Sequence, residues 1–168
     1  LVTGVQTCAL PISITPYNSI SISGSTQTIS TYTAPDITSI TLGTITTNSI
    51  AINVNGYYDH YDILIGANTV ATNITGVTYV DISGYNGIIP DASYNYTIIP
   101  YNVNNLVGIS KSITAFTLPI LDSLTLGSVT ATSVQLFFSG SYKYVNITNN
   151  GSSIANNITG NTYLDNNG

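Results

Sequence analysis

The stretch YYDHYD, residues 57–62, gathers the residue types that most often perform acid–base chemistry or bind metals. It contains the only histidine of the chain, His60, and two of the seven aspartates, Asp59 and Asp62. A histidine beside carboxylates can act as a general base or ligate a metal. Hydrolysis would need a second catalytic group held in position, however, and a metal site would need more ligands. The stretch is therefore either a site or an ordinary structural element.

Alternation of apolar and polar residues favours the structural interpretation. Tyr61, Ile63 and Ile65 recur with a period of two, which is typical of a half-buried β-strand. If these three side chains point inward, His60 and Asp62 lie together on the solvated outer face. The sequence therefore predicts a strand here and no catalytic, cofactor-binding or metal-binding residues.

The composition of the chain predicts an all-β fold. Apolar residues make up 43% of the sequence and charged residues only 5%, against about 25% in ordinary domains. Thr, Ser and Asn must provide solubility, and with Ile, Val and Tyr they are the residues of strands and turns. Strong helix formers are scarce, so no long helix is expected.

The charge and the motifs exclude several classes of function. The net charge is −5, with Lys111 and Lys143 as the only cations, so neither nucleic acid nor an anionic membrane surface is an expected partner. No apolar run reaches the 18 to 20 residues or so of a spanning helix, so membrane insertion is not expected. The sequence has no Gly-rich phosphate loop, calcium-binding D-x-D loop or Ser–His–Asp constellation. The chain is therefore predicted not to be an enzyme and to need no cofactor.

The N-terminal residues differ from the rest of the sequence. Residues 2–12, VTGVQTCALPI, resemble the in-frame translation of a sequencing-library adapter and contain the only cysteine, Cys8. We interpret residues 1–12 as an artefact outside the fold and the chain as a truncated fragment. Without Cys8, neither disulfides nor thiolate zinc sites are expected.

An internal repeat organises the remainder. Similar segments recur 84 residues apart: ITPYN at 14–18 and IIPYN at 98–102, TLGTIT at 41–46 and TLGSVT at 125–130, NITGVTYVD at 73–81 and NITGNTYLD at 157–165. Residues 35–84 and 119–168 are identical at 19 of 50 positions, where biased composition alone would give roughly five. The chain is therefore predicted to be a segment of a tandem array of such repeats.

This repeat predicts the domain boundaries. Residues 13–33 would be the C-terminal strands of one truncated unit, residues 34–117 a complete unit, and residues 118–168 the N-terminal part of a further truncated unit. Pro35 and Pro119 would mark the junctions, because proline ends a strand and stiffens a short link.

Seven short strands are predicted in the complete unit, separated by turn signals at NG (55 and 86), GAN (66) and PDAS (90). The predicted strands are 37–44, 48–55, 58–66, 68–73, 77–82, 92–102 and 107–116. This number of strands in about 84 residues suits an antiparallel β-sandwich.

The segment IIPDASYNYTIIPYN, residues 88–102, resembles the entry to the sixth strand of fibronectin type III domains. The matching positions are Ile88, Pro90, Tyr94, Tyr96, Ile98 and Asn102. The resemblance implies an immunoglobulin-like sandwich in which the Tyr94 hydroxyl bonds to upstream backbone as a tyrosine corner. The sequence departs from the family at the second strand, where Val54 and Phe138 replace the usual tryptophan, so tyrosine and isoleucine must fill the core.

The repeat also bears on the histidine stretch. In the next unit Lys143, Tyr144 and Asn146 stand where Asp59, His60 and Asp62 stand in the first. The two units therefore share no set of ligands, which again argues against a site.

Two functions are consistent with these features. The first is a non-catalytic structural spacer or stalk in a larger extracellular, cell-surface or virion-surface protein, with neighbouring repeat units as partners. The alternative is a carbohydrate- or receptor-binding accessory module with a glycan or protein partner. Each truncated unit would leave an open sheet edge, so we also expect strand addition between molecules.

Overall fold

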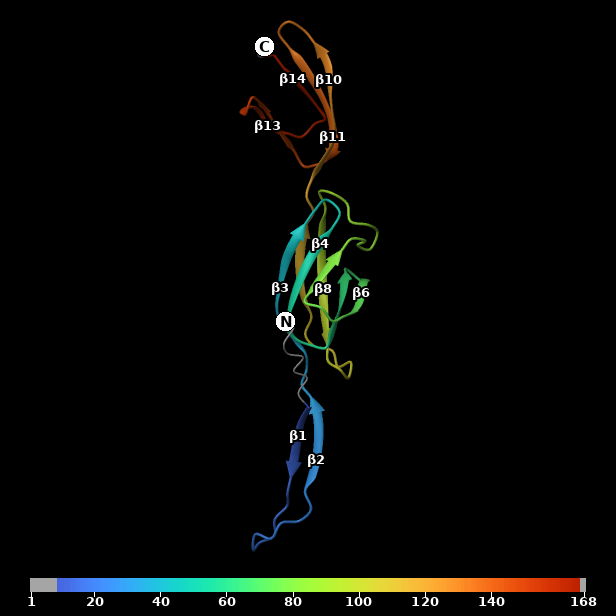
Figure 1. Ribbon diagram of the computed structural model, residues 1–168, viewed down its shortest axis with the longest axis vertical. Helices are drawn as coiled ribbons and strands as arrows, with labels where there is room; N and C mark the ends of the chain where they lie inside the picture. The colour runs from blue at the N-terminus through green and yellow to red at the C-terminus, as the bar shows by residue number, and fades with distance from the viewer. Residues whose placement is uncertain (1–8, 167–168) are drawn as a thin grey trace. The chain divides into compact units, whose positions relative to one another are not determined.

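A computed structural model describes residues 9–166, which form fourteen β-strands and contain no helix long and apolar enough to cross a membrane (Figure 1). The strands are β1 Ala9–Ile14, β2 Gln27–Tyr32, β3 Asp36–Ile45, β4 Ile50–Tyr57, β5 His60–Ile65, β6 Asn68–Ile74, β7 Thr78–Asp81, β8 Ser93–Tyr101, β9 Lys111–Phe116, β10 Ile120–Val129, β11 Val134–Ser141, β12 Val145–Asn149, β13 Ser152–Ile158 and β14 Thr162–Asp165. The expected all-β class is confirmed.

The chain divides into two compact units, each assembled from several segments. One comprises Leu1–Gly43, Ala51–Val80 and Asn95–Thr114, and the other comprises Thr44–Ile50, Asp81–Tyr94 and Ala115–Gly168. These units differ from the ranges expected from the repeat. The domain ranges 13–33, 34–117 and 118–168 therefore stay a prediction.

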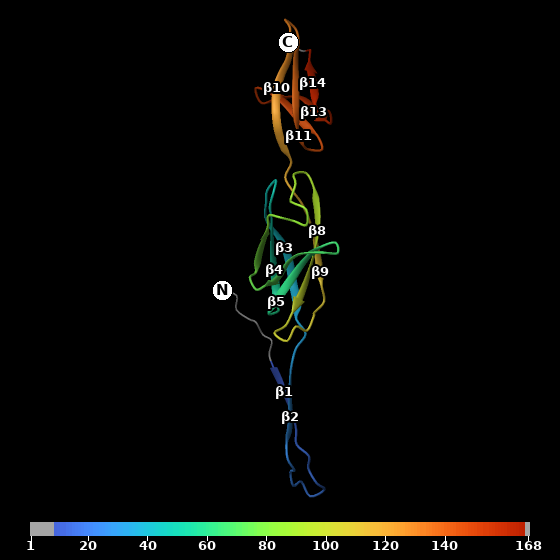
Figure 2. The ribbon, with the colours of Figure 1, turned by 90° about the vertical axis from the view of Figure 1, so that its right-hand side faces the viewer.

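Two antiparallel sheets form a sandwich over residues 36–116. One sheet has the strand order β3-β4-β7 and the other has the order β6-β5-β8-β9. Figure 2 shows β3 and β4 in one layer and β8 and β9 in the other. A three-stranded sheet facing a four-stranded one, with sequential strands exchanged between them, is the expected immunoglobulin-like, fibronectin type III-like β-sandwich.

The core of the sandwich lies between these sheets. The fully buried side chains that β3 and β4 contribute are Ile37, Ile50, Ile52 and Val54, and those from β5 and β8 are Tyr61, Ile63, Tyr96, Ile98 and Pro100. The Tyr61 ring also meets the edge of Tyr58, with ring centroids 5.2 Å apart. Tyrosine and isoleucine therefore supply the volume that tryptophan provides in the family, as expected.

The strand boundaries repeat with the same offset as the sequence. Adding 84 to β2, β3, β4, β6 and β7 gives the bounds of β9, β10, β11, β13 and β14 without any difference. Of these strands, β10, β11 and β14 form a sheet in that order, β13 pairs with β12, and β9 belongs to the four-stranded sheet of the sandwich. The repeat seen in the sequence is therefore also a repeat of local structure.

One turn signal in the sequence is wrong. Asn55 and Gly56 lie inside β4, which ends at Tyr57, so they form no turn. Gly56 is instead required by a close approach, because a Cβ there would overlap the carbonyl oxygen of Asp36. The NG pair at 86 behaves as expected, since Gly87 has a φ of 96°.

All seven predicted strands exist, but five of them start one to four residues later than expected. The strand predicted at 48–55 is Ile50–Tyr57, because Thr46 and Ser49 close a turn through a 2.9 Å backbone hydrogen bond. The strand predicted at 107–116 starts at Lys111, since Val107 makes only an isolated bridge to Tyr101.

The β1–β2 hairpin includes part of the segment interpreted as an adapter. β1 pairs antiparallel with β2, with Ile12 opposite Ile29. The structure thus gives no support to the adapter interpretation of residues 9–12, and residues 1–8 lie outside the described residues.

Candidate functional site

His60 lies at the start of β5 and is largely covered, which corrects the prediction of a solvated histidine. Its side chain is 12% exposed. The Tyr101 ring, opposite it on β8, stacks on the imidazole with a centroid separation of 5.1 Å and an interplanar angle of 8°. Its Nδ1 lies 3.0 Å from the Asp59 carboxylate. The cross-strand aromatic partner therefore removes His60 from solvent, a contact that alternation alone does not reveal.

Asp62 has a structural role that is repeated in the next unit. Its Oδ1 accepts a 2.9 Å hydrogen bond from the backbone N–H of Asn73, which has a φ of 55°. At the corresponding positions, Asn146 Oδ1 accepts a 2.9 Å hydrogen bond from Asn157 N–H, and the φ of Asn157 is 57°. Because an amide replaces the carboxylate without loss of the bond, this position needs an acceptor and no charge.

Tyr101 joins the two candidate residues. Burial raises the pKa of the Tyr101 hydroxyl, and the charge of Asp62 and a hydrogen bond with it raise this pKa further. Tyr101 on β8 thus contacts two residues of β5, His60 through ring stacking and Asp62 through a side-chain hydrogen bond.

Within residues 9–166, no group of three or more His, Cys, Asp or Glu side chains could hold a metal ion. The histidine stretch accordingly gathers none of the extra ligands that a metal site would need. That the chain has no catalytic, cofactor or metal residues remains a prediction.

Tyr94 makes the contacts expected of a tyrosine corner. Its hydroxyl accepts a hydrogen bond from the backbone N–H of Ile89 at 2.8 Å and donates one to the carbonyl of Gly87 at 3.3 Å. These partners lie five and seven residues upstream in the connection between the sheets, so this prediction is confirmed.

Asn102 has a role that the sequence reasoning missed. It is 1% exposed, and its Oδ1 accepts hydrogen bonds from the backbone N–H groups of Asn104 and Leu106 at 2.9 and 3.0 Å. Its Nδ2 donates to the carbonyl of Thr33 at 3.0 Å. The recurrence of PYN at 16–18 and 100–102 was the available signal, because Asn18 makes the same turn with Ile20 and Ile22.

The connection at Thr117 is also held by hydrogen bonds. The Thr117 hydroxyl donates to the carbonyl of Ile89 at 2.7 Å and accepts from Ala92 N–H at 2.9 Å. The next residue, Leu118, donates its N–H to the carbonyl of Thr46 at 3.1 Å. Sequence reasoning identified this connection by Pro119 but not by its hydrogen bonds.

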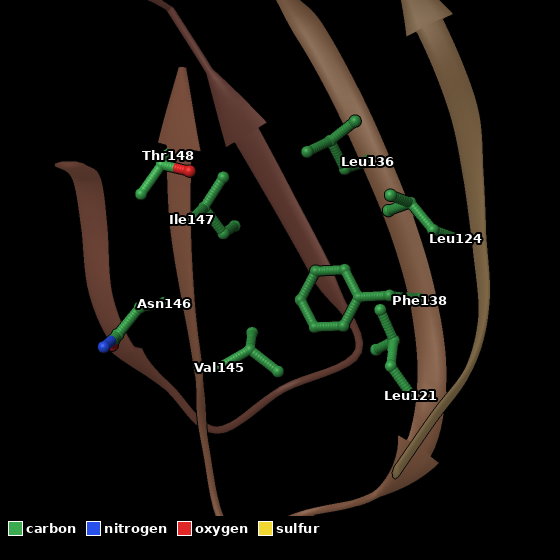
Figure 3. A pocket seen from close by; sticks show the side chains of 8 residues that line it. All are labelled: Leu121, Leu124, Leu136, Phe138, Val145, Asn146, Ile147 and Thr148. Carbon is green, nitrogen blue, oxygen red and sulfur yellow. The ribbon is translucent and has the colours of Figure 1, made fainter. Parts of the chain in front are cut away.

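An apolar pocket of about 240 Å³ lies in the second unit between β10, β11 and β12. Figure 3 shows Phe138, Val145 and Ile147 pointing toward one another across it, while Asn146 points away. The full lining is Leu121, Leu124, Leu136, Phe138, Val145, Asn146, Ile147 and Thr148. Six of the eight lining side chains are apolar, so the pocket is suited to apolar packing.

No protein-family model and no curated protein matches the sequence. Among solved structures, the chain is similar to the central fibronectin-III array of RIM-binding protein, with 10% identity, a TM-score of 0.38 and coverage of 80% of this chain and 58% of that one. It is also similar to the FN1–FN3 domains of chicken CNTN1, with 10% identity, a TM-score of 0.38 and coverage of 89% and 62%. The chain thus spans about three-fifths of each of these structures, and its fold is assigned from the strand order described above.

Proposed function

We propose that this chain is a non-catalytic structural spacer, a stalk segment of a larger extracellular, cell-surface or virion-surface protein. The observation that carries the proposal is the short, hydrogen-bonded connection between successive repeats. Three residues, 33–35, separate β2 from β3, and three residues, 117–119, separate β9 from β10. A spacer needs such connections, because a long flexible link would let adjacent units move independently.

Each of the two connections shows one part of the hydrogen bonds that a junction between two complete repeats would have. Thr33 receives the hydrogen bond from Asn102, which lies later in the chain, and Thr117 bonds to Ile89 and Ala92, which lie earlier. Since Thr33 and Thr117 are 84 residues apart, the repeat implies that an internal junction receives both sets. An uncharged Thr/Ser/Asn surface also suits an exposed element without enzymatic chemistry.

Distance measurements between spin labels test the stiffness of the junction. The labels would be placed at Thr31→Cys and Ala67→Cys, both exposed, in a Cys8→Ser background. We expect one narrow distance distribution, which Asn102→Ala broadens and the control Asn104→Ala leaves narrow. A broad distribution in the chain with intact Asn102 would contradict a stiff junction.

A carbohydrate- or receptor-binding accessory module is the alternative function. The observation that favours it is the exposure of Tyr57 and Tyr85, each 56% exposed, because accessible aromatic rings stack on sugars. Glycan-array binding by the chain at about micromolar affinity or tighter, lost in Tyr57→Ala or Tyr85→Ala, would replace the spacer proposal with this one.

A further inference from the structure

The apolar pocket of the second unit corresponds to the buried core of the sandwich. Subtracting 84 from the numbers of its main apolar residues, Leu121, Leu136, Phe138, Val145 and Ile147, gives Ile37, Ile52, Val54, Tyr61 and Ile63. All five residues of the sandwich are 0% exposed, whereas Leu121 is 50% exposed, three of its neighbours are partly exposed (Leu136, Val145 and Ile147) and Phe138 is 5% exposed. The pocket is therefore a sandwich core without a covering layer among the described residues.

The β1–β2 hairpin carries apolar side chains of the type that covers this core in the sandwich. Ile12 and Ile14 are 54% and 69% exposed, and the residues 84 positions later, Tyr96 and Ile98, are both 0% exposed. Ile29 lies opposite Ile12 and extends the same face of the hairpin. Three large aliphatic side chains thus form an exposed apolar face on an isolated two-stranded element, which is marginally stable by itself.

The strand edges match as well as the faces. In the sandwich, β5 lies between β6 and β8 in the order β6-β5-β8-β9. Among residues 9–166, β12 pairs only with β13 and β1 only with β2, so each of β12 and β1 keeps one unpaired edge. Joining these edges gives the order β13-β12-β1-β2, which reproduces the sandwich sheet.

We propose that the pocket of one molecule receives the β1–β2 hairpin of a second copy of this chain. The sandwich fixes the register: Ile63 lies opposite Ile98 in the β5–β8 pair, so Ile147 of one copy faces Ile14 of the other. The sandwich of residues 36–116 separates the hairpin from the pocket along the chain, so a second copy is the proposed source of the hairpin. Such association is heterologous and head-to-tail, and it continues into chains unless it closes into a ring.

The first test is the mass of the unmodified chain under reducing conditions, which prevent Cys8 disulfides. Sedimentation velocity should show a weight-average mass that rises with protein concentration. Ile12→Asp, which places a charge on the face that enters the pocket, should return the chain to the monomer mass. The matched control Ser13→Asp changes the opposite face of the same strand and should leave association unchanged. A monomer at all concentrations up to about 1 mM, or equal association in both variants, would overturn the proposal.

The second test is disulfide formation at the expected register in a Cys8→Ser background. One copy carries Ile147→Cys and the other carries Ile14→Cys. Mild oxidation of the mixture should cross-link this pair on the order of tenfold more than the control pair of Ile147→Cys with Ser13→Cys, whose sulfurs point to opposite faces. Equal yields would overturn the register even if the chain associates. Cross-linking confined to a single chain that carries both cysteines would overturn the second copy as the occupant.

Discussion

The side-chain amide of Asn102 donates a hydrogen bond to the carbonyl oxygen of Thr33, 69 residues earlier in the chain. The same side chain accepts two backbone hydrogen bonds from its own loop. One buried asparagine therefore shapes the loop after β8 and holds the connection that precedes β3. It is the residue on which the proposed stiffness of the junction most depends.

Replacing Asn102 should loosen both the loop and the connection. In Asn102→Ala the N–H groups of Asn104 and Leu106 lose their shared acceptor, and because both residues are exposed and their donors can turn to water, each lost hydrogen bond costs about 0.5–1.5 kcal/mol. Amide hydrogen exchange should show faster exchange at these two positions than in the original chain. Asn104→Ala is the control, and unchanged protection in Asn102→Ala would show that the loop does not depend on this side chain.

Asp62 should tolerate neutralisation but not truncation. Asp62→Asn keeps the acceptor for Asn73 N–H, as Asn146 does in the next unit, so the free energy of unfolding should stay nearly unchanged. Asp62→Ala removes the acceptor and should lower this free energy by about 1 kcal/mol. Urea unfolding followed by tyrosine fluorescence measures both. A larger loss in Asp62→Asn than in Asp62→Ala would mean that the negative charge itself matters.

Gly56 is expected to be irreplaceable because of its close contact with β3. An added Cβ would overlap Asp36 O and crowd the Ile37 backbone, so Gly56→Ala should lower the free energy of unfolding by about 1–3 kcal/mol. Gly76→Ala is the control, since its Cβ would come no closer than 3.7 Å to Thr78 O. Equal urea midpoints for the two variants would contradict the packing of β3 against β4.

Alkaline pH should destabilise the sandwich through its buried tyrosines. Burial raises the pKa values of Tyr58 and Tyr61 above their ordinary value of 10.0. Their contribution to stability is therefore complete below pH 10.0 and is lost as the pH rises from there toward the raised folded-state values.

Ultraviolet absorbance of phenolate measures the ionisation of these tyrosines, and urea unfolding at each pH measures the free energy of unfolding. Tyr61→Phe should weaken the dependence of stability on pH above 10.0, whereas Tyr57→Phe, at an exposed position, should not. Phenolate formation at Tyr58 and Tyr61 in the folded chain near pH 10.0 would contradict their burial.

Much of the sandwich follows from local sequence signals. Alternation located all seven strands of residues 36–116, and turn residues such as Gly66, with a φ of 61°, marked their ends. Of the three side chains of β5 predicted to point inward, Tyr61 and Ile63 are 0% exposed, but Ile65 is only partly buried. A period of two assigns a face but does not say where the opposing sheet ends.

The contacts that alternation could not provide are those between distant segments. The stacking of Tyr101 on His60 depends on the register of β5 against β8, and that register is a tertiary property. Gly56 was misread as part of a turn because a glycine needed for a close backbone approach has the same sequence signature. The sequence identified His60 as a candidate residue, but it did not reveal that the Tyr101 ring covers it.

Single-molecule stretching of the chain most directly tests the claim that the repeat is a self-contained mechanical element. With handles at both ends, one unfolding event of the sandwich should release about 270 Å of contour length, from 84 residues at about 3.6 Å each less the length of the folded unit. A chain that extends without a discrete event, or whose event spans clearly more than one repeat, would contradict the account.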